Sequence, residues 1–197
     1  VVTSSPEGGD YAWVSTSGGV LMDGLDLGSE FNGSALRSNL FSAEAGDLLR
    51  FYFNFVTTDG SGFSDYAWAR LLDGSAHQVA LLITARTTPN DNSVPGYGMP
   101  AIAATINPSM VTVNPGSPNW TPVGSDCYGT GCGYTGWIES TYTIAGAGNY
   151  FLEFGAVNWA DGSYQTGLAF DGITVGGNPA SNPISEPASF ALMGLGL

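Results

Sequence analysis

Residues 46–56 alternate apolar and polar side chains with a period of two, the pattern of a β-strand that buries one face. The apolar face would carry Leu49, Phe51, Phe53 and Phe55, and the polar face Arg50, Tyr52 and Asn54. An acidic, glycine-rich turn follows at residues 57–62, and an extended pattern resumes at residues 65–72. The segment therefore predicts two strands of a β-sandwich joined by an acidic turn.

Further short apolar runs, bounded by glycine and proline, predict the remaining strands. They lie at residues 11–15, 79–83, 134–144, 149–155 and 165–175, while residues 33–47 are interpreted as a turn that feeds the central strand. No long window carries the 3.6-residue apolar period of an amphipathic helix. We therefore expect an all-β antiparallel sandwich in residues 1–176, with a long irregular connection at 87–122. A linker and an apolar tail follow in residues 177–197.

The composition fits one globular β domain. The chain has 197 residues, 43% of them hydrophobic and 12% aromatic, which is too apolar for a disordered protein, and 29 Gly and 11 Pro supply frequent turns. Asp and Glu number 17 against 4 Lys and Arg together, so the formal net charge is −13 at pH 7. Because a nucleic-acid surface needs a basic patch that displaces counterions, we expect no nucleic-acid partner. The acidic surface suits solubility and cation binding.

Two cysteines, Cys127 and Cys132, lie in a glycine-rich segment and are separated by four residues. They are too few for a zinc site, and the single histidine, His77, is distant in the sequence. We therefore predict a local disulfide, with free thiols as the alternative, and an oxidising compartment. The chain starts at Val1 rather than Met, so we expect a processed and exported protein.

Residues 185–189, Ser-Glu-Pro-Ala-Ser, precede an apolar run at residues 190–197. This arrangement resembles the C-terminal sorting signal of the PEP-CTERM proteins of Gram-negative, exopolysaccharide-producing bacteria, in which Pro-Glu-Pro is followed by an apolar helix and an Arg cluster. Here Ser185 replaces the first Pro, and no basic cluster follows. The resemblance implies secretion to the cell surface or extracellular matrix, with membrane contact only during sorting.

The domain also resembles the secreted, jelly-roll-like β-sandwich modules that such proteins often carry. The resemblance rests on residues 59–71 (DGSGFSDYAWARL), 132–137 (CGYTGW) and 167–175 (GLAFDGITV). In related modules an Asp in the last strand helps to hold a structural calcium ion, and Asp171 is the matching residue. Calcium takes about six to eight oxygen ligands, which aspartates in predicted turns could complete. These are Asp59, Asp65 and Asp161, for which turn capping is the alternative role.

The leading functional hypothesis is a non-enzymatic structural protein, because the sequence carries no nucleophile–base signature and no phosphate-binding loop. An apolar tail left over after the sandwich could add a strand to a neighbouring copy, as donor strands do. The residues expected to pack there are Phe190, Leu192, Leu195 and Leu197. The expected product is a homo-oligomer or a filamentous homopolymer of the cell surface or biofilm matrix.

The alternative is a calcium-stabilised module that binds exopolysaccharide. Sugars stack on exposed aromatic rings, and five candidate rings lie in or beside predicted loops: Trp120, Tyr134, Trp137, Trp159 and Tyr164. Core packing is the competing role for these rings. A third hypothesis is glycoside hydrolysis by Glu139 and Glu153, which requires the two carboxyl groups to face each other across a cleft.

Overall fold

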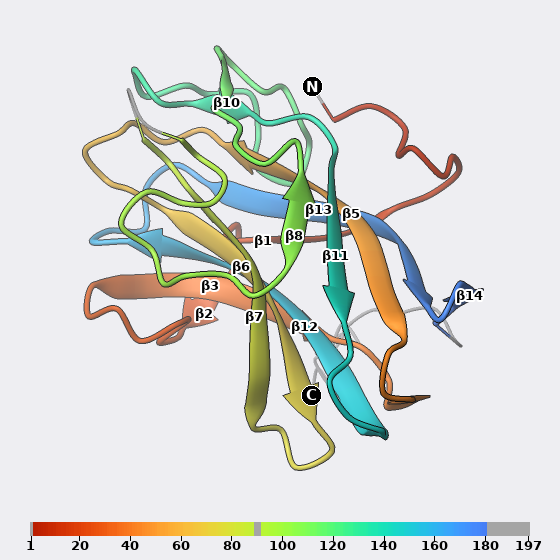
Figure 1. Cartoon of the computed structure of the whole chain (residues 1–197). Helices are drawn as coiled ribbons and strands as arrows, with labels where there is room; N and C mark the ends of the chain where they lie inside the picture. The colour runs from red at the N-terminus through yellow and green to blue at the C-terminus, as the bar shows by residue number, and fades with distance from the viewer. Residues whose placement is uncertain (1, 89–91, 181–197) are drawn as a thin grey trace, which may run out of the picture.

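The computed structural model describes residues 2–88 and 92–180, which form two antiparallel β-sheets packed as a sandwich (Figure 1). Sheet A contains β1 (Ala12–Ser15), β5 (Leu48–Thr57), β8 (Thr105–Asn107), β9 (Asn114–Pro115), β10 (Gly133–Tyr134), β11 (Ile138–Thr143), β13 (Thr166–Val175) and β14 (Asn178–Pro179). Sheet B contains β2 (Val20–Leu21), β3 (Glu30–Arg37), β4 (Phe41–Ala43), β6 (Tyr66–Asp73), β7 (Gln78–Arg86) and β12 (Gly148–Trp159). No helix occurs in these described residues, and the all-β prediction is confirmed.

The order of the long strands gives the sandwich its jelly-roll topology. Sheet A runs β1-β13-β5-β11, and sheet B runs β3-β12-β6-β7. From β5 the chain crosses to β6 and β7 in sheet B and then returns to sheet A, where the short strands β8, β9 and β10 precede β11. It then passes through β12 of sheet B to β13 of sheet A. The last long strand, β13, therefore lies between the early strands β1 and β5, as in a double-sheet jelly roll.

The core lies between the two sheets, where the alternating pattern of β5 predicts it. Leu49, Phe51, Phe53 and Phe55 are all buried. Phe154 of β12 stacks on Phe170 of β13 with ring centroids 3.8 Å apart, and it meets Phe51 edge to face. Each fully buried side chain of this size contributes about 1.5–3 kcal/mol of transfer free energy. The sandwich is thus held together by aromatic contacts that cross from sheet A to sheet B.

Residues 33–47 differ from the predicted turn, because they contain most of β3 and all of β4. β3 pairs with β12 along one side and with the two-residue β2 along the other. Only Gly33 of β3 is fully buried, so the strand lacks the apolar alternation that a sequence pattern can detect. Its extended conformation comes from pairing with β12.

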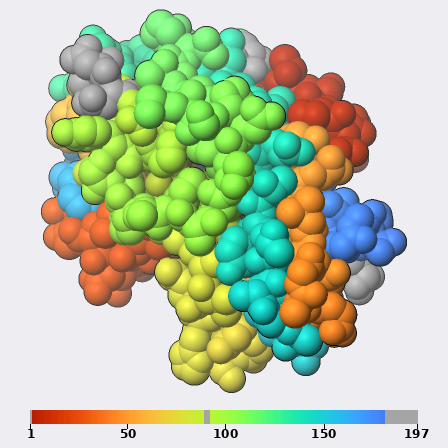
Figure 2. Space-filling model, in the orientation of Figure 1, coloured from red at the N-terminus to blue at the C-terminus, as the bar shows by residue number. Residues whose placement is uncertain are grey.

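The long connection after β7 covers one side of sheet B. Its backbone bonds to the outer edge of β7, with Gly96 donating to the Thr84 carbonyl at 3.0 Å and Ala103 donating to the Leu81 carbonyl at 2.8 Å. Figure 2 shows this segment, coloured green near residue 100, spread over the upper part of the visible face. The connection protects β7 from pairing with another chain.

Beyond Gly176 the described chain continues as β14, which pairs with the end of β13 at Thr174 and Val175. Sheet A thus extends three residues past the predicted end of the sandwich at residue 176. The assembly residues of the tail, Phe190, Leu192, Leu195 and Leu197, lie outside the described residues. Their predicted role stays a prediction.

Candidate functional site

A groove of about 760 Å³ opens on the outer face of sheet A, where the N-terminal segment meets the loop before β10. Three of its eight lining residues are aromatic, and its polar side chains carry three hydroxyls and one carboxyl. The lining residues are Gly9, Asp10, Tyr11, Trp13, Ser17, Trp120, Thr121 and Pro122. An aromatic, concave surface with a few polar groups is the usual character of a small-ligand site.

Trp13 supplies the exposed ring of this groove. On β1, Val14 is buried and Ala12 packs on the core, so the alternation of a strand directs the Trp13 side chain outward. The Trp13 side chain is 50% exposed, and its ring meets Trp120 edge to face with centroids 6.2 Å apart. A large apolar ring is therefore presented to solvent beside a second ring that fixes its position.

Trp120 forms the rigid wall of the groove. It is buried, and its Nε1 donates to the Tyr11 hydroxyl at 3.1 Å. Below it lies Gly167 of β13, where a Cβ would come within 2.8 Å of the Trp120 ring and 2.9 Å of the Val14 carbonyl oxygen. A glycine at this position thus allows the indole to lie directly on the strand.

Hydrogen bonds tie the Trp120 loop to β1. Trp120 and Gly124 exchange two backbone hydrogen bonds, of 3.1 and 2.8 Å, which close a tight turn. The Ser15 hydroxyl donates to the Pro122 carbonyl at 2.6 Å. Behind the groove, Tyr11 packs edge to face on Trp137, whose Nε1 donates to the Thr3 carbonyl at 3.1 Å. The aromatic wall is therefore formed before any ligand binds.

The structure separates the five predicted sugar-binding rings. Trp120 lines the groove, and Trp137 and Tyr134 are half-buried in the cluster behind it. Trp159 packs on Tyr66 and lies 5.0 Å below the Arg86 guanidinium, so its role is structural. Tyr164 lies near the disulfide loop instead. The prediction missed Trp13 and Tyr11, although the outward position of Trp13 in its predicted strand could have indicated exposure.

The four predicted calcium ligands do not form one cluster. Asp65 is buried, and its carboxyl accepts hydrogen bonds from the Trp159 amide at 2.7 Å and from Thr166 Oγ1 at 2.9 Å. Asp59 and Asp161 lie close enough to raise its pKa electrostatically. Asp171 is five residues further along β13 than Thr166, about 16 Å away, and it accepts a hydrogen bond from the Ser5 hydroxyl.

Burial raises the pKa of Asp65 well above its ordinary value, and raises the pKa of Asp59 to about 6. Within residues 2–88 and 92–180, no group of three or more His, Cys, Asp or Glu side chains is arranged to hold a metal ion. The described carboxyl groups thus do not fit the predicted four-aspartate calcium site, and both oxygens of Asp65 already accept hydrogen bonds from the protein. The predicted stabilisation of the fold by calcium stays a prediction, which melting curves with calcium and with EDTA would test.

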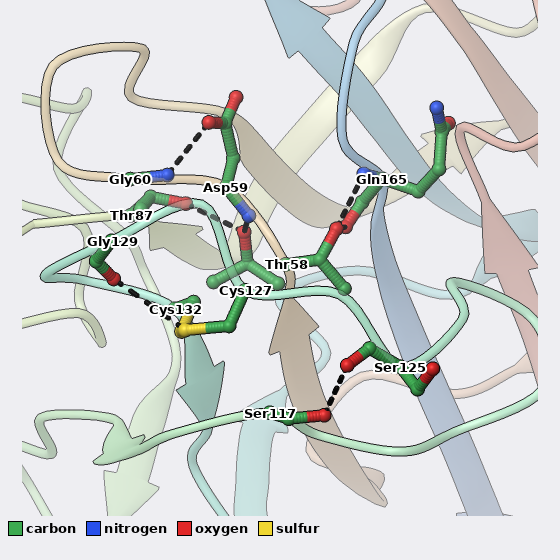
Figure 3. The surroundings of a disulfide bond; sticks show 11 residues. Thr58, Asp59, Gly60, Thr87, Ser117, Ser125, Cys127, Gly129, Cys132 and Gln165 are labelled. Atoms are coloured by element: carbon green, nitrogen blue, oxygen red, sulfur yellow. Dashed lines mark hydrogen bonds between the residues drawn. A yellow bond between two sulfur atoms is a disulfide. The ribbon is translucent and has the colours of Figure 1, made fainter.

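The predicted disulfide between Cys127 and Cys132 is confirmed (Figure 3). Its loop lies against the acidic turn between β5 and β6, where Tyr128 donates a backbone hydrogen bond to Thr58 at 2.9 Å and Ser61 donates one to Thr130 at 2.8 Å. Thr58 in turn bonds to Gln165 before β13. Hydrogen bonds thus join the disulfide loop, the acidic turn and the segment before β13 at one end of the sandwich.

Glu139 and Glu153 lie on opposite outer faces of the sandwich, because each alternates with side chains that face the core. Glu139 lies 3.8 Å from Arg50. The Glu153 carboxylate lies between the guanidinium groups of Arg37, at 2.8 Å, and Arg70, at 2.6 Å. Burial alone would raise the pKa of Glu153, but the two guanidinium groups outweigh it and lower this pKa below its ordinary value. Since the sandwich separates the two carboxyl groups, the hypothesis that this pair hydrolyses a glycoside is wrong.

No protein-family model matches the chain, and no curated protein matches it. In the part of the chain that the structure describes, no helix is long and apolar enough to cross a membrane.

Proposed function

We propose that this protein binds a neutral polysaccharide in the groove lined by Tyr11, Trp13 and Trp120, and that it does so outside the cell. One observation carries the proposal: the Trp13 ring is half exposed in a groove whose wall is fixed by Trp120. The role is binding without catalysis. The exopolysaccharide of a Gram-negative bacterium is the ligand that the resemblance to exported surface proteins favours.

The chemistry of the groove suits a sugar. The C–H face of a pyranose ring is apolar and packs on an indole, while its hydroxyls need hydrogen-bonding partners at the edge. Asp10, Ser17 and Thr121 supply such partners around the aromatic wall. Asp10 is the one charged lining residue, and the chain carries a net charge of −13, so an anionic polysaccharide would be repelled.

Affinity electrophoresis in gels that contain soluble neutral glucans, xylans or mannans tests this proposal. At least one polysaccharide should retard the wild-type protein, and Trp13→Ala should weaken that binding about tenfold or more, equivalent to about 1.4 kcal/mol. Trp13→Phe should retain part of it. Tyr97→Ala is a matched control, because Tyr97 is 58% exposed but lies on the loop that covers β7. Equal retardation of Trp13→Ala and wild type would overturn the proposal.

Assembly through the C-terminal tail is a second candidate function. One observation favours it: the edge strand β2 exposes Val20 and Leu21, and a strand from another copy could pair there. The tail residues Phe190, Leu192, Leu195 and Leu197 would supply the incoming apolar side chains. Size-exclusion chromatography of the full chain and of a chain that lacks residues 189–197 tests this. Assembly that survives the deletion would contradict it.

A further inference from the structure

Two tyrosines form a second exposed aromatic surface beside the disulfide loop. Tyr128 is 54% exposed and Tyr164 is 36% exposed, and their ring centroids lie 4.9 Å apart. Phe63 packs edge to face on Tyr128 with centroids 5.4 Å apart. These contacts keep the rings together at the surface, although neither tyrosine belongs to the sandwich core.

The backbone holds both rings in place. Tyr128 belongs to the loop that the disulfide closes, and its ring lies over Gly60, where a Cβ would come within 2.8 Å of it. Tyr164 has φ of +51°, a left-handed conformation that costs energy for a tyrosine. The next residue, Gln165, is fixed by its backbone amide, which donates to Thr58 Oγ1 at 2.7 Å. The tyrosine pair is therefore preformed.

The groove and the tyrosine pair are neighbours. Ser17 lines the groove, and the adjacent residue Thr16 donates its hydroxyl to the Gln165 side chain at 2.8 Å. Thr16 also donates its backbone amide to the Thr166 carbonyl at 2.9 Å. Tyr164 directly precedes this hydrogen-bonded pair of segments. Consequently Ser17 of the groove and Tyr164 are each adjacent in sequence to residues of the same hydrogen-bonded pairing.

We propose that the Tyr128–Tyr164 pair is a second contact for the polysaccharide whose first contact is the groove. This inference rests on the function proposed above and specifies its ligand as an extended polymer of sugar units. A monosaccharide or disaccharide would occupy the groove alone. A longer chain that leaves the groove past Ser17 would reach the two tyrosine rings.

Two linked contacts change how affinity depends on ligand length. Once one part of the polymer is bound in the groove, the second contact forms at a high effective concentration. Because both surfaces are preformed, little conformational entropy is lost when the second contact forms. Affinity should therefore rise in a step when the oligosaccharide becomes long enough to span from Trp13 to Tyr164.

Isothermal titration calorimetry with cello-, xylo-, manno- and malto-oligosaccharides, from disaccharide to octasaccharide, tests this inference. For the series that binds the wild-type protein, affinity should increase about tenfold when the oligosaccharide becomes long enough to form the second contact. Tyr128→Ala and Tyr164→Ala should remove that increase and leave the affinity for short members unchanged. Trp13→Ala should weaken binding at every length, and Tyr97→Ala should change nothing. Melting temperatures and thiol counts of the tyrosine variants check that their folds and disulfides are intact.

The two proposals fail in different ways. If wild-type affinity does not rise with length, or if a folded Tyr128→Ala variant binds long members as well as wild type does, the second contact is overturned and the groove stands. If no oligosaccharide or polysaccharide binding depends on Trp13, both proposals are overturned.

Discussion

Asp65 accepts a hydrogen bond from the Thr166 hydroxyl at 2.9 Å, which joins the turn before β6 to the first residue of β13. Thr166 Oγ1 also lies within hydrogen-bond distance of Thr57 Oγ1, at 2.8 Å, so a buried polar network connects both sheets beneath the disulfide loop. Both tyrosines of the proposed second contact lie in loops above this network. The protonation of the carboxyl groups in this network therefore affects the stability of that end of the sandwich.

Stability should fall as pH rises through this region. Burial raises the pKa of Asp59 from an ordinary value near 3.8 to about 6. Between those values the folded protein binds more protons than the unfolded chain, so the free energy of unfolding decreases with increasing pH. The contribution of Asp59 is fully present below about pH 4 and is lost as pH passes about 6.

Thermal melting of wild type and Asp59→Asn between about pH 4 and about pH 7 measures this effect. The wild-type melting temperature should decrease across that range relative to the variant, because the variant has no carboxyl group to ionise there. Parallel pH profiles of the two proteins would contradict the raised pKa of Asp59.

The disulfide should contribute modestly to stability. Because the bond between Cys127 and Cys132 closes a short loop, the chain-entropy model gives about 2 kcal/mol, near the lower end of the usual range. Replacing both cysteines by serine should lower the urea midpoint by the corresponding amount and leave a folded sandwich. An unchanged midpoint would show that the loop is held by its backbone hydrogen bonds to Thr58 and Ser61 alone.

Gly167→Ala should damage the groove. The new methyl group would meet the Trp120 ring at 2.8 Å and the Val14 carbonyl at 2.9 Å, and this overpacking should cost about 1–3 kcal/mol in the free energy of unfolding. Gly146→Ala is the matched control, since a Cβ there meets no atom within 4 Å. Chemical denaturation of the two variants gives the comparison, and equal stabilities would mean that Trp120 can move away without loss.

The sequence predicts the fold where burial produces a periodic pattern. Buried and partly exposed residues alternate along β5 from Leu48 to Phe53, and the contrast between Val14 and Trp13 follows the same rule. β3 was not predicted, because its pairing with β12 compensates for a sequence that buries only Gly33. The register of such a strand is set by the strand with which it pairs, and a local sequence pattern carries no information about that partner.

The groove could not be predicted for a different reason. It depends on contacts between residues about a hundred positions apart, such as the Ser15–Pro122 hydrogen bond and the Trp13–Trp120 ring contact. The same limit applies to the predicted calcium ligands. Asp59 and Asp161 lie near Asp65, close enough to raise its pKa. Asp171 lies further along β13, the strand whose first residue, Thr166, bonds to Asp65. The disulfide was predictable because both partners lie in one short loop.

The most direct test of polysaccharide binding is an NMR titration of the five tryptophan indole N–H signals with the neutral polysaccharides named above. Trp13→Phe and Trp120→Phe assign two signals by their loss, and fully buried Trp68 serves as the internal reference. The Trp13 signal should shift with added polysaccharide while the Trp68 signal stays in place. An unmoved Trp13 signal with every polysaccharide, or shifts confined to other tryptophans, would contradict the account.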